Sequence, residues 1–200
     1  MPQKPNHLPA ALAMALALTA TIGTAVFAPA TTHAQPKDDR AAHPVIALQA
    51  PDGWTRTPIN LYLNRNMGFS VEYDNEVVTA TLFQYDRGLD HIPDDLAHDI
   101  VREEVDRNIE AITDRLESGR MLPFELLHDE LITLGDSAQQ AHWLRYQLTH
   151  RGVTQYHDNL IWSKDNQFLK LRYTINQADD EHQRPSIHAL LTRLGNNSQE

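Results

Sequence analysis

The stretch from residue 140 to residue 176, QAHWLRYQLTHRGVTQYHDNLIWSKDNQFLKLRYTIN, decides the fold class of this chain. Alternation of apolar and polar residues is typical of strands with one buried face, and it recurs here in three runs: 140–149, 153–163 and 167–176. His150-Arg151-Gly152 fits a three-residue hairpin loop with glycine in the left-handed position, and Lys164-Asp165-Asn166 makes a second turn. We therefore predict three consecutive antiparallel strands.

Further strand signals lie before this stretch. Residues 68–73 place Phe69, Val71 and Tyr73 on one face, and the more continuously apolar run 77–85 follows the turn Asp74-Asn75, so the two segments predict a hairpin. Residues 124–134 also have β-strand character, although polar residues interrupt the run.

Two helices are predicted from a period near 3.6 residues. The first spans residues 93–116, with a stripe of apolar residues three or four positions apart: Ala97, Val101, Val105, Ile109, Ile112 and Leu116. Pro93 suits its first turn, and Gly119 marks its stop. The second spans residues 185–194, with Gly195 as its stop.

The order of these elements predicts an α+β fold, an antiparallel β-sheet with one long early helix and a C-terminal helix packed on it. In this layout the chain resembles small exported proteins of the PsbP-like fold, including periplasmic DcrB-type proteins. The resemblance covers residues 45–195 and lies in Ala50-Pro51-Asp52-Gly53-Trp54, the strand from Gly68, both helices and the three-strand meander. It implies a binding or assembly factor without a shared catalytic residue set.

The first residues have the order of a secretory signal peptide. Lys4 precedes an uncharged run at residues 8–28, and Thr32-His33-Ala34 is a small-residue cleavage site. We predict a signal peptide at 1–34, a flexible leader at 35–44, a single α+β domain at 45–195 and a disordered tail at 196–200. The mature protein is then periplasmic or secreted, without a stable membrane anchor; a retained anchor is the alternative, because about 20 apolar residues can span a bilayer.

Composition excludes several classes of protein. The chain has no cysteine, which rules out a disulfide framework and a cysteine zinc site, and its formal net charge of −10 argues against nucleic-acid binding. Residues 93–117 alone hold nine acids and three arginines. This helix presents either an ordinary solvated face or an acidic docking surface for a basic protein partner.

The meander also predicts a candidate ligand site. With the hairpin loop as assigned, Leu144, Tyr146 and Leu148 share the core face with Tyr156, Leu160 and Trp162. Asp158 falls there too and needs a buried partner, for which Tyr146 or Tyr173 is available. The opposite face then gathers basic and aromatic side chains, Trp143, Arg145, His157 and Arg172, beside Lys170.

Arginine forks and aromatic rings on one surface suit a small anionic or amphipathic ligand. The alternative is a half-solvated face whose cations pair with the acidic helix. Both interpretations depend on strand register, because a slip of one residue exchanges the faces.

No catalytic motif, metal site or cofactor site is predicted. A nucleophile elbow and a glycine-rich phosphate loop are both absent from the sequence, and the acids near His91 and His98 suit a helix N-terminus better than a metal site. We therefore expect a non-catalytic binding or assembly protein. The alternative is a periplasmic hydrolase or metal-dependent enzyme whose site is assembled from dispersed residues.

Overall fold

A computed structural model describes residues 49–118 and 123–196, all of which belong to one compact unit. The predicted signal peptide, leader, first domain residues 45–48, stop at Gly119 and tail residues 197–200 lie outside the described residues. Within them, no helix is both long and apolar enough to cross a membrane.

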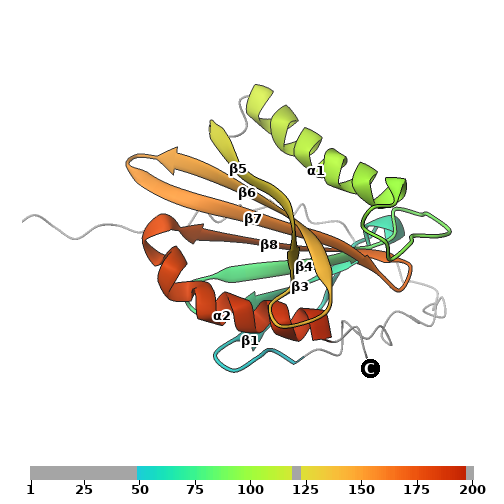
Figure 1. Ribbon diagram of the computed structural model, residues 1–200, viewed down its shortest axis with the longest axis horizontal. Helices are drawn as coiled ribbons and strands as arrows, with labels where there is room; N and C mark the ends of the chain where they lie inside the picture. Colours follow the sequence, from blue (N-terminus) through green and yellow to red (C-terminus); the bar gives the residue numbers. More distant parts are fainter. Residues whose placement is uncertain (1–48, 119–122, 197–200) are drawn as a thin grey trace, which may run out of the picture. The chain divides into compact units, whose positions relative to one another are not determined.

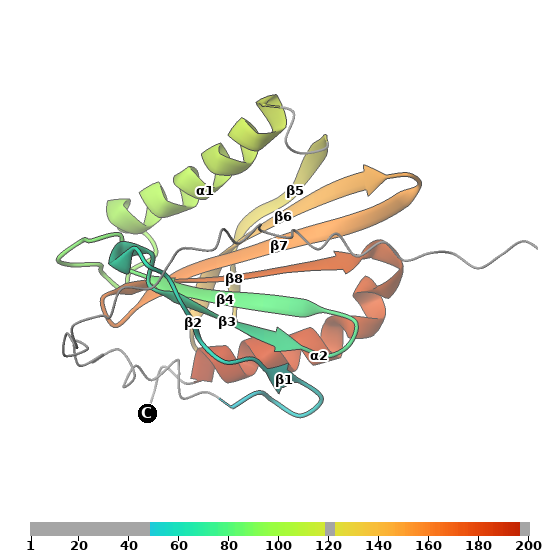
Figure 2. The ribbon, with the colours of Figure 1, turned by 180° about the vertical axis from the view of Figure 1, so that it is seen from behind.

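The described residues form an antiparallel sheet with two α-helices, which confirms the predicted α+β class (Figures 1 and 2). The sheet order is β1-β3-β4-β8-β7-β6-β5, and β2 also pairs with β3. A short 3₁₀ helix, Arg65–Met67, precedes β3. The strands are β1 (Thr55–Arg56), β2 (Asn60–Leu61), β3 (Phe69–Asp74), β4 (Thr79–Tyr85), β5 (Phe124–Thr133), β6 (Gln140–His150), β7 (Val153–Lys164) and β8 (Gln167–Asn176).

The two turns of the meander fix its register. Arg151 and Gly152 both have positive φ, 51° and 79°, as do Asp165 and Asn166, at 50° and 63°. Two consecutive residues with positive φ make the tight hairpin turn that matches strand twist. His150 therefore pairs directly with Val153, so the turn has two residues and not the three predicted.

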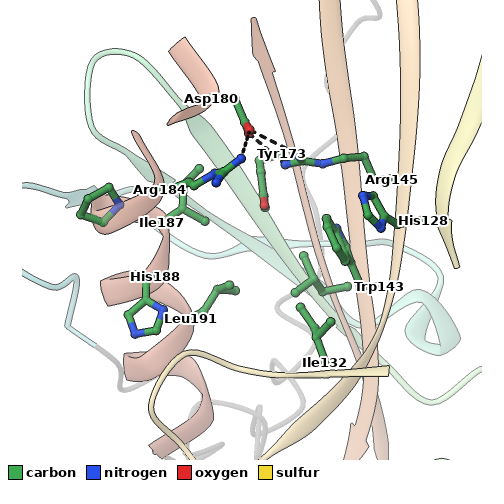
Figure 3. A pocket seen from close by; sticks show the side chains of 12 residues that line it. His128, Ile132, Trp143, Arg145, Tyr173, Asp180, Arg184, Ile187, His188 and Leu191 are labelled. Carbon is green, nitrogen blue, oxygen red and sulfur yellow. Dashed lines mark hydrogen bonds and ion pairs between the residues drawn. The ribbon is translucent and has the colours of Figure 1, made fainter. Parts of the chain in front are cut away.

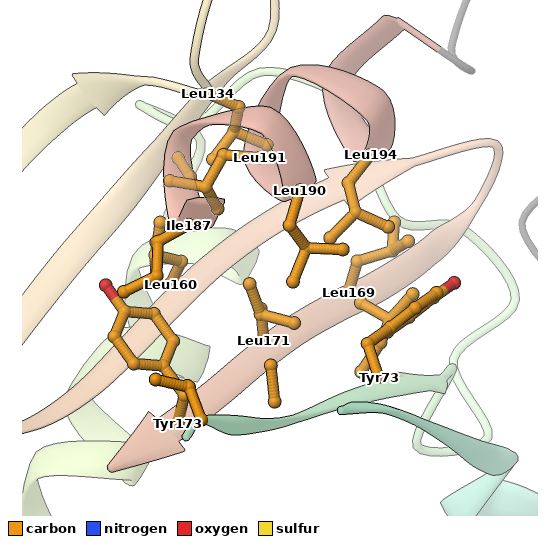
Figure 4. Packing of buried hydrophobic residues seen from close by; sticks show 14 of the residues in the cluster. Tyr73, Leu134, Leu160, Leu169, Leu171, Tyr173, Ile187, Leu190, Leu191 and Leu194 are labelled. Atoms are coloured by element: carbon orange, nitrogen blue, oxygen red, sulfur yellow. The ribbon is translucent and has the colours of Figure 1, made fainter. Parts of the chain in front are cut away.

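One face of the sheet packs against α2 (Gln177–Asn196) and holds the larger core (Figure 4). Leu190, Leu191 and Leu194 of the helix lie over Leu169 and Leu171 of β8. Trp54 closes the edge of this core, and its indole Nε1 donates to the carbonyl of Ser186 at 3.2 Å.

The other face of the sheet packs against α1 (Asp99–Glu117). Val105 of the helix belongs to one buried cluster with Leu144, Tyr146, Leu148 and Ile161. Both faces of the central strands are therefore covered, which explains why β7 is buried almost continuously from Asp158 to Ser163.

Both helices differ from their predicted limits. α1 begins at Asp99 rather than Pro93, because the His98 side chain caps it by accepting from the Ile100 amide. α2 begins at Gln177, directly after β8, so Pro185 lies inside it rather than at its start. Gly195, predicted as a stop, is also helical. A Cβ at this position would overlap the side chain of Ser137, which explains why a glycine stands here inside the helix. Asn196, assigned to the tail, is the last helical residue.

Candidate functional site

The observed register divides the four predicted site residues between the two faces of the sheet. Trp143 pairs with Leu160 and Arg145 with Asp158, so both side chains lie on the α2 face. His157 pairs with Tyr146 and Arg172 with Asn159, so these two lie on the α1 face. The predicted single surface was wrong, because the shorter turn at Arg151-Gly152 shifts β7 by one residue against β6.

Arg145 and Asp158 form a buried ion pair on the α2 face. Arg145 Nε donates to Asp158 Oδ1 at 2.8 Å and Nη2 donates to Oδ2 at 3.0 Å. The same guanidinium reaches Asp180 of α2, with Nη2 to Oδ1 at 3.0 Å. The side chain of Arg145 is 12% exposed and that of Asp158 is 0% exposed. The partner of Asp158 is therefore Arg145 and not a tyrosine as predicted.

Two aromatic rings complete this cluster. Trp143 Nε1 donates to Asp158 Oδ1 at 2.5 Å, and the Arg145 guanidinium lies 4.7 Å from the centre of the Tyr156 ring. Burial raises the pKa of Asp158, and the hydrogen bonds and charge of Arg145 oppose that rise. Burial disfavours the charge on Arg145, yet the contacts to Asp158 outweigh it and raise the pKa of Arg145 overall. The guanidinium thus stays charged, and its ion pairs connect β6 with β7 and with α2.

A groove beside this cluster runs between α2 and strands β5 and β6 (Figure 3). Its volume is about 650 Å³, and we call it the α2 groove. Figure 3 shows Ile187 and Leu191 of α2 on one side and Ile132 and Trp143 of the sheet on the other, with Asp180 between Arg145 and Arg184 at one end. The lining is His128, Ile132, Trp143, Arg145, Leu160, Tyr173, Asp180, Arg184, Pro185, Ile187, His188 and Leu191.

The polar end of the α2 groove combines fixed and exposed charges. Arg184 is 69% exposed and touches Asp180 through one contact of 3.4 Å. His128 stacks on Trp143 with ring centres 4.2 Å apart. Burial is the main cause that raises the pKa of Tyr173, and the charge of Asp158 adds to it, so the hydroxyl stays neutral. Asp180 and Arg184 were missed, because the C-terminal helix was predicted to begin only at Pro185.

A second, smaller cavity lies on the α1 face, where His157 and Arg172 line about 150 Å³ together with Arg115, Tyr146 and Lys170. We call it the α1 cavity. Lys170 was expected on the same face as Arg172, and it is found there, since alternate residues of β8 point to one side. Arg115 was not part of the prediction, because sequence alone does not show which end of a helix crosses which strand.

The hydroxyl groups of the described serines take part in local structure. In residues 49–118 and 123–196, none is hydrogen-bonded to a histidine; their contacts are Ser70 with Tyr62, Ser118 with Arg115, Ser137 with Leu134, Ser163 with Pro93 and Ser186 with Asn75. Asp95 and His98 accept hydrogen bonds from the nearby Ala97 and Ile100 amides. These acids and histidines therefore shape the turn before α1, and no metal-binding group of three or more ligands occurs among the described residues.

Comparison with known proteins gives only structural neighbours, since no family model and no curated protein matches the chain. The solution structure of cyanobacterial PsbP from Synechocystis sp. PCC 6803 is similar over 70% of this chain and 79% of its own, at 12% identity and a TM-score of 0.46. PA94, a Pseudomonas aeruginosa protein of unknown function, is similar over 70% and 83%, at 18% identity and a TM-score of 0.37.

LpqN, which is involved in cell envelope biogenesis of Mycobacterium tuberculosis, is similar over 72% of this chain and 78% of its own. Its identity is 14% and its TM-score 0.32. A PsbP structure is thus among the similar structures, in line with the layout predicted from the sequence. Similarity at identities of 12% to 18% concerns the fold alone and says nothing about function.

Proposed function

We propose that this chain is an exported, non-catalytic binding protein that holds an amphipathic small molecule in the α2 groove. The observation that carries the proposal is the composition of this groove, in which apolar side chains of helix and sheet face each other beside a fixed polar end. Its volume, about 650 Å³, lies within the range of small-molecule sites.

The apolar part of the α2 groove suits a hydrocarbon or ring system. Ile132, Ile187 and Leu191 come from two different elements, so a ligand between them loses contact with water on both sides. Removal of apolar surface from water contributes about 25 cal/mol per Å². This term supplies most of the affinity for such a ligand.

The polar end sets the kind of head group. Arg145 and Arg184 balance Asp158 and Asp180, so this end carries no formal excess charge. The loosely held Arg184 side chain keeps donors available at the mouth of the groove. A head group that accepts hydrogen bonds fits this arrangement, as an uncharged ester or a carboxylate does.

Two further observations support the other parts of the proposal. The serine hydroxyls of the described residues bond to backbone carbonyls and non-basic side chains, so no serine there is activated by a histidine, as the hydrolase alternative with a serine nucleophile requires. The uncharged run at 8–28 and the site at Thr32-His33-Ala34 support export. Cell fractionation with intact-mass measurement is expected to recover a periplasmic or secreted chain that begins at Gln35; a full-length chain in the membrane fraction contradicts export.

Calorimetric titration with dodecanoate and with monododecanoyl glycerol tests the groove. We expect saturable binding to one site with a negative heat-capacity change, the mark of apolar burial. Ile132→Glu places a charge in the groove and is expected to abolish binding. Leu131→Glu is the matched control, because this neighbour on β5 is exposed and points to the opposite face of the sheet.

A thermal melt of both variants shows whether they remain folded. If Ile132→Glu unfolds, Arg184→Ala replaces it and is expected to weaken dodecanoate binding about tenfold, the value of one charge-assisted hydrogen bond. Equal affinities in the parent protein and in a folded groove variant contradict the proposal.

A further inference from the structure

The α1 cavity differs in chemistry from the α2 groove, because three cations and two unpaired polar groups line it together. We propose that the α1 cavity binds a tetrahedral oxyanion, free phosphate or a phosphate monoester, through Arg115, Tyr146, His157, Lys170 and Arg172. This inference does not rest on the function proposed for the α2 groove, which lies on the other face of the sheet.

The position of the cavity follows from register. His157 pairs with Tyr146 across β6 and β7, and Arg172 pairs with Asn159 across β7 and β8, so all four side chains share the α1 face. Arg115 lies in the last turn of α1. Four separate elements thus direct polar groups into one small space.

The three cations lack carboxylate partners. In the part of the chain that the structure describes, Arg115, Lys170 and Arg172 form no ion pair, although the protein is acidic overall. Ala111 and Ile112 occupy the helix positions three and four residues before Arg115, where a paired acid would stand. Positive charge is therefore concentrated at this cavity, and no ion pair neutralises it.

Nearby groups hold two of the cations in place. Lys170 Nζ donates to Asn108 Oδ1 at 3.0 Å and lies 5.3 Å from the centre of the Phe83 ring, which also lies 5.3 Å from the Arg172 guanidinium. Contact of a cation with a ring face is attractive and fixes the side chain. These side chains are positioned before any ligand arrives, which lowers the entropy cost of binding.

Glu104, the α1 carboxylate whose charge acts on Lys170, is already engaged by other partners. Glu104 accepts from Arg87 Nη1 at 3.0 Å and from the Tyr85 hydroxyl at 2.7 Å. Burial lowers the pKa of Lys170, the charge of Glu104 opposes this, and Arg172 and Arg115 lower it further. A bound anion would offset the cost of keeping Lys170 charged among other cations.

Two buried polar atoms at the cavity have no hydrogen-bond partner. They are the hydroxyl of Tyr146, a residue only 1% exposed, and Nε2 of His157. His157 Nδ1 lies 3.0 Å from Thr174 Oγ1; when this hydroxyl donates, the neutral ring carries its hydrogen on Nε2. Unpaired buried donors are costly, and an anion in the cavity would accept from both.

Size and donor arrangement indicate the class of anion. A volume of about 150 Å³ is below the usual range for drug-sized ligands and suits one small group. Donors arrive from α1, β6, β7 and β8, and an anion with oxygens in several directions can meet them at once. A tetrahedral oxyanion has this shape, whereas a planar carboxylate has two oxygens.

Calorimetric titration of the full chain with inorganic phosphate, sulfate and glycerol 3-phosphate tests the proposal. We expect saturable binding of one anion per chain. Tighter binding of inorganic phosphate than of glycerol 3-phosphate identifies a free-ion site, and the reverse order identifies a monoester site. No saturable binding of any of the three overturns the proposal.

Arg172→Gln and Arg115→Gln are expected to weaken binding at least about tenfold, because each removes a charge-assisted contact. Arg102→Gln is the matched control for Arg115→Gln, since Arg102 is an exposed arginine of the same helix that does not line the α1 cavity. Weakening by the control as large as that by Arg115→Gln would show a general charge effect and overturn the assignment.

Tyr146→Phe separates a binding role from a structural one. It removes only the unpaired hydroxyl, so the melting temperature without anion is expected to stay equal or rise, while phosphate affinity falls about fivefold. A lower melting temperature with unchanged phosphate affinity would show that the hydroxyl serves the fold, and this result overturns its place in the site.

Discussion

At the scale of single residues, the buried polar groups of the chain fall into two contrasting kinds, those with hydrogen-bond partners and those without. The guanidinium of Arg145 forms ion pairs with the buried carboxylates of Asp158 and Asp180. His157 and Tyr146, on the other face, each keep one polar atom without a partner. The first arrangement stabilises the fold, whereas the second leaves groups that a ligand can satisfy.

Arg145→Ala is expected to lower the free energy of unfolding by about 3 to 5 kcal/mol, because it removes the buried charge that pairs with Asp158 and Asp180. Asp158 then keeps only the Trp143 indole, and Asp180 only the exposed Arg184. Urea denaturation measures the change. Arg193→Ala, an exposed arginine of α2, should stay within about 0.5 kcal/mol. A loss below about 1 kcal/mol for Arg145→Ala would mean that the buried cluster does not hold these elements together.

His157 gives a prediction for pH. Burial, together with the charge of Arg172, lowers its pKa in the folded protein below the value of 6.5 for an unperturbed histidine. The unfolded chain therefore takes up the proton first, so the contribution of His157 to stability is present above pH 6.5 and is lost as pH falls. We expect the free energy of unfolding to fall more steeply between about pH 7 and pH 5 for the parent chain than for His157→Gln.

Saturating sulfate, which stays doubly charged between about pH 7 and pH 5, should change this result. The free energy of unfolding of the parent chain should then fall no more steeply than that of His157→Gln, or less steeply. The cations facing His157 are Arg115 from α1 and Lys170 and Arg172 from β8, and a bound dianion would offset their repulsion of a protonated ring. Identical pH profiles for the two proteins, with and without sulfate, would contradict this account of His157.

At the scale of elements, the strands were predictable and the helix ends were not. Apolar alternation together with the turn residues Arg151-Gly152 and Asp165-Asn166 placed β6, β7 and β8 within one residue of their observed limits. The start of α2 was missed because Pro185 is a common signal for the first turn of a helix, whereas here the helix tolerates it internally.

The candidate site was only partly predictable for a related reason. Two residues of the proposed anion site, His157 and Arg172, were among those predicted. Trp143 and Arg145 were placed with them because the predicted loop was one residue too long. The signal that could have corrected this lay in Asp158, since a buried carboxylate is best paired with the arginine directly across the ladder. Contacts from helices, as with Arg115 and Asp180, depend on packing that no local pattern encodes.

Gly195→Ala tests the contact between α2 and the loop before β6. Alanine normally stabilises a helix relative to glycine by up to about 1 kcal/mol, but here its Cβ would overlap the Ser137 side chain. We expect a loss of about 1 to 3 kcal/mol in thermal or urea unfolding, as for other overpacked sites. Gly195→Ala with Ser137→Gly should recover most of it, and a stabilised single variant would show that α2 does not approach this loop.

At the scale of the whole described unit, one sheet is covered by a helix on each face, and each helix leaves a cavity of different character. The α2 groove is large and mainly apolar, whereas the α1 cavity is small and basic. The residues predicted from the sequence to form a single site therefore lie at two cavities, back to back across β6, β7 and β8. Binding of two unlike ligands on opposite faces is the central claim for this protein.

An amide-resolved NMR titration of one isotope-labelled sample with sulfate and then dodecanoate tests this claim most directly. Sulfate is expected to shift the signals of Arg115, Tyr146, His157, Lys170 and Arg172, and dodecanoate those of Ile132, Ile187 and Leu191 instead. The two sets should saturate independently. Shifts in one common set of residues, or no saturable shift with either ligand, would contradict the account.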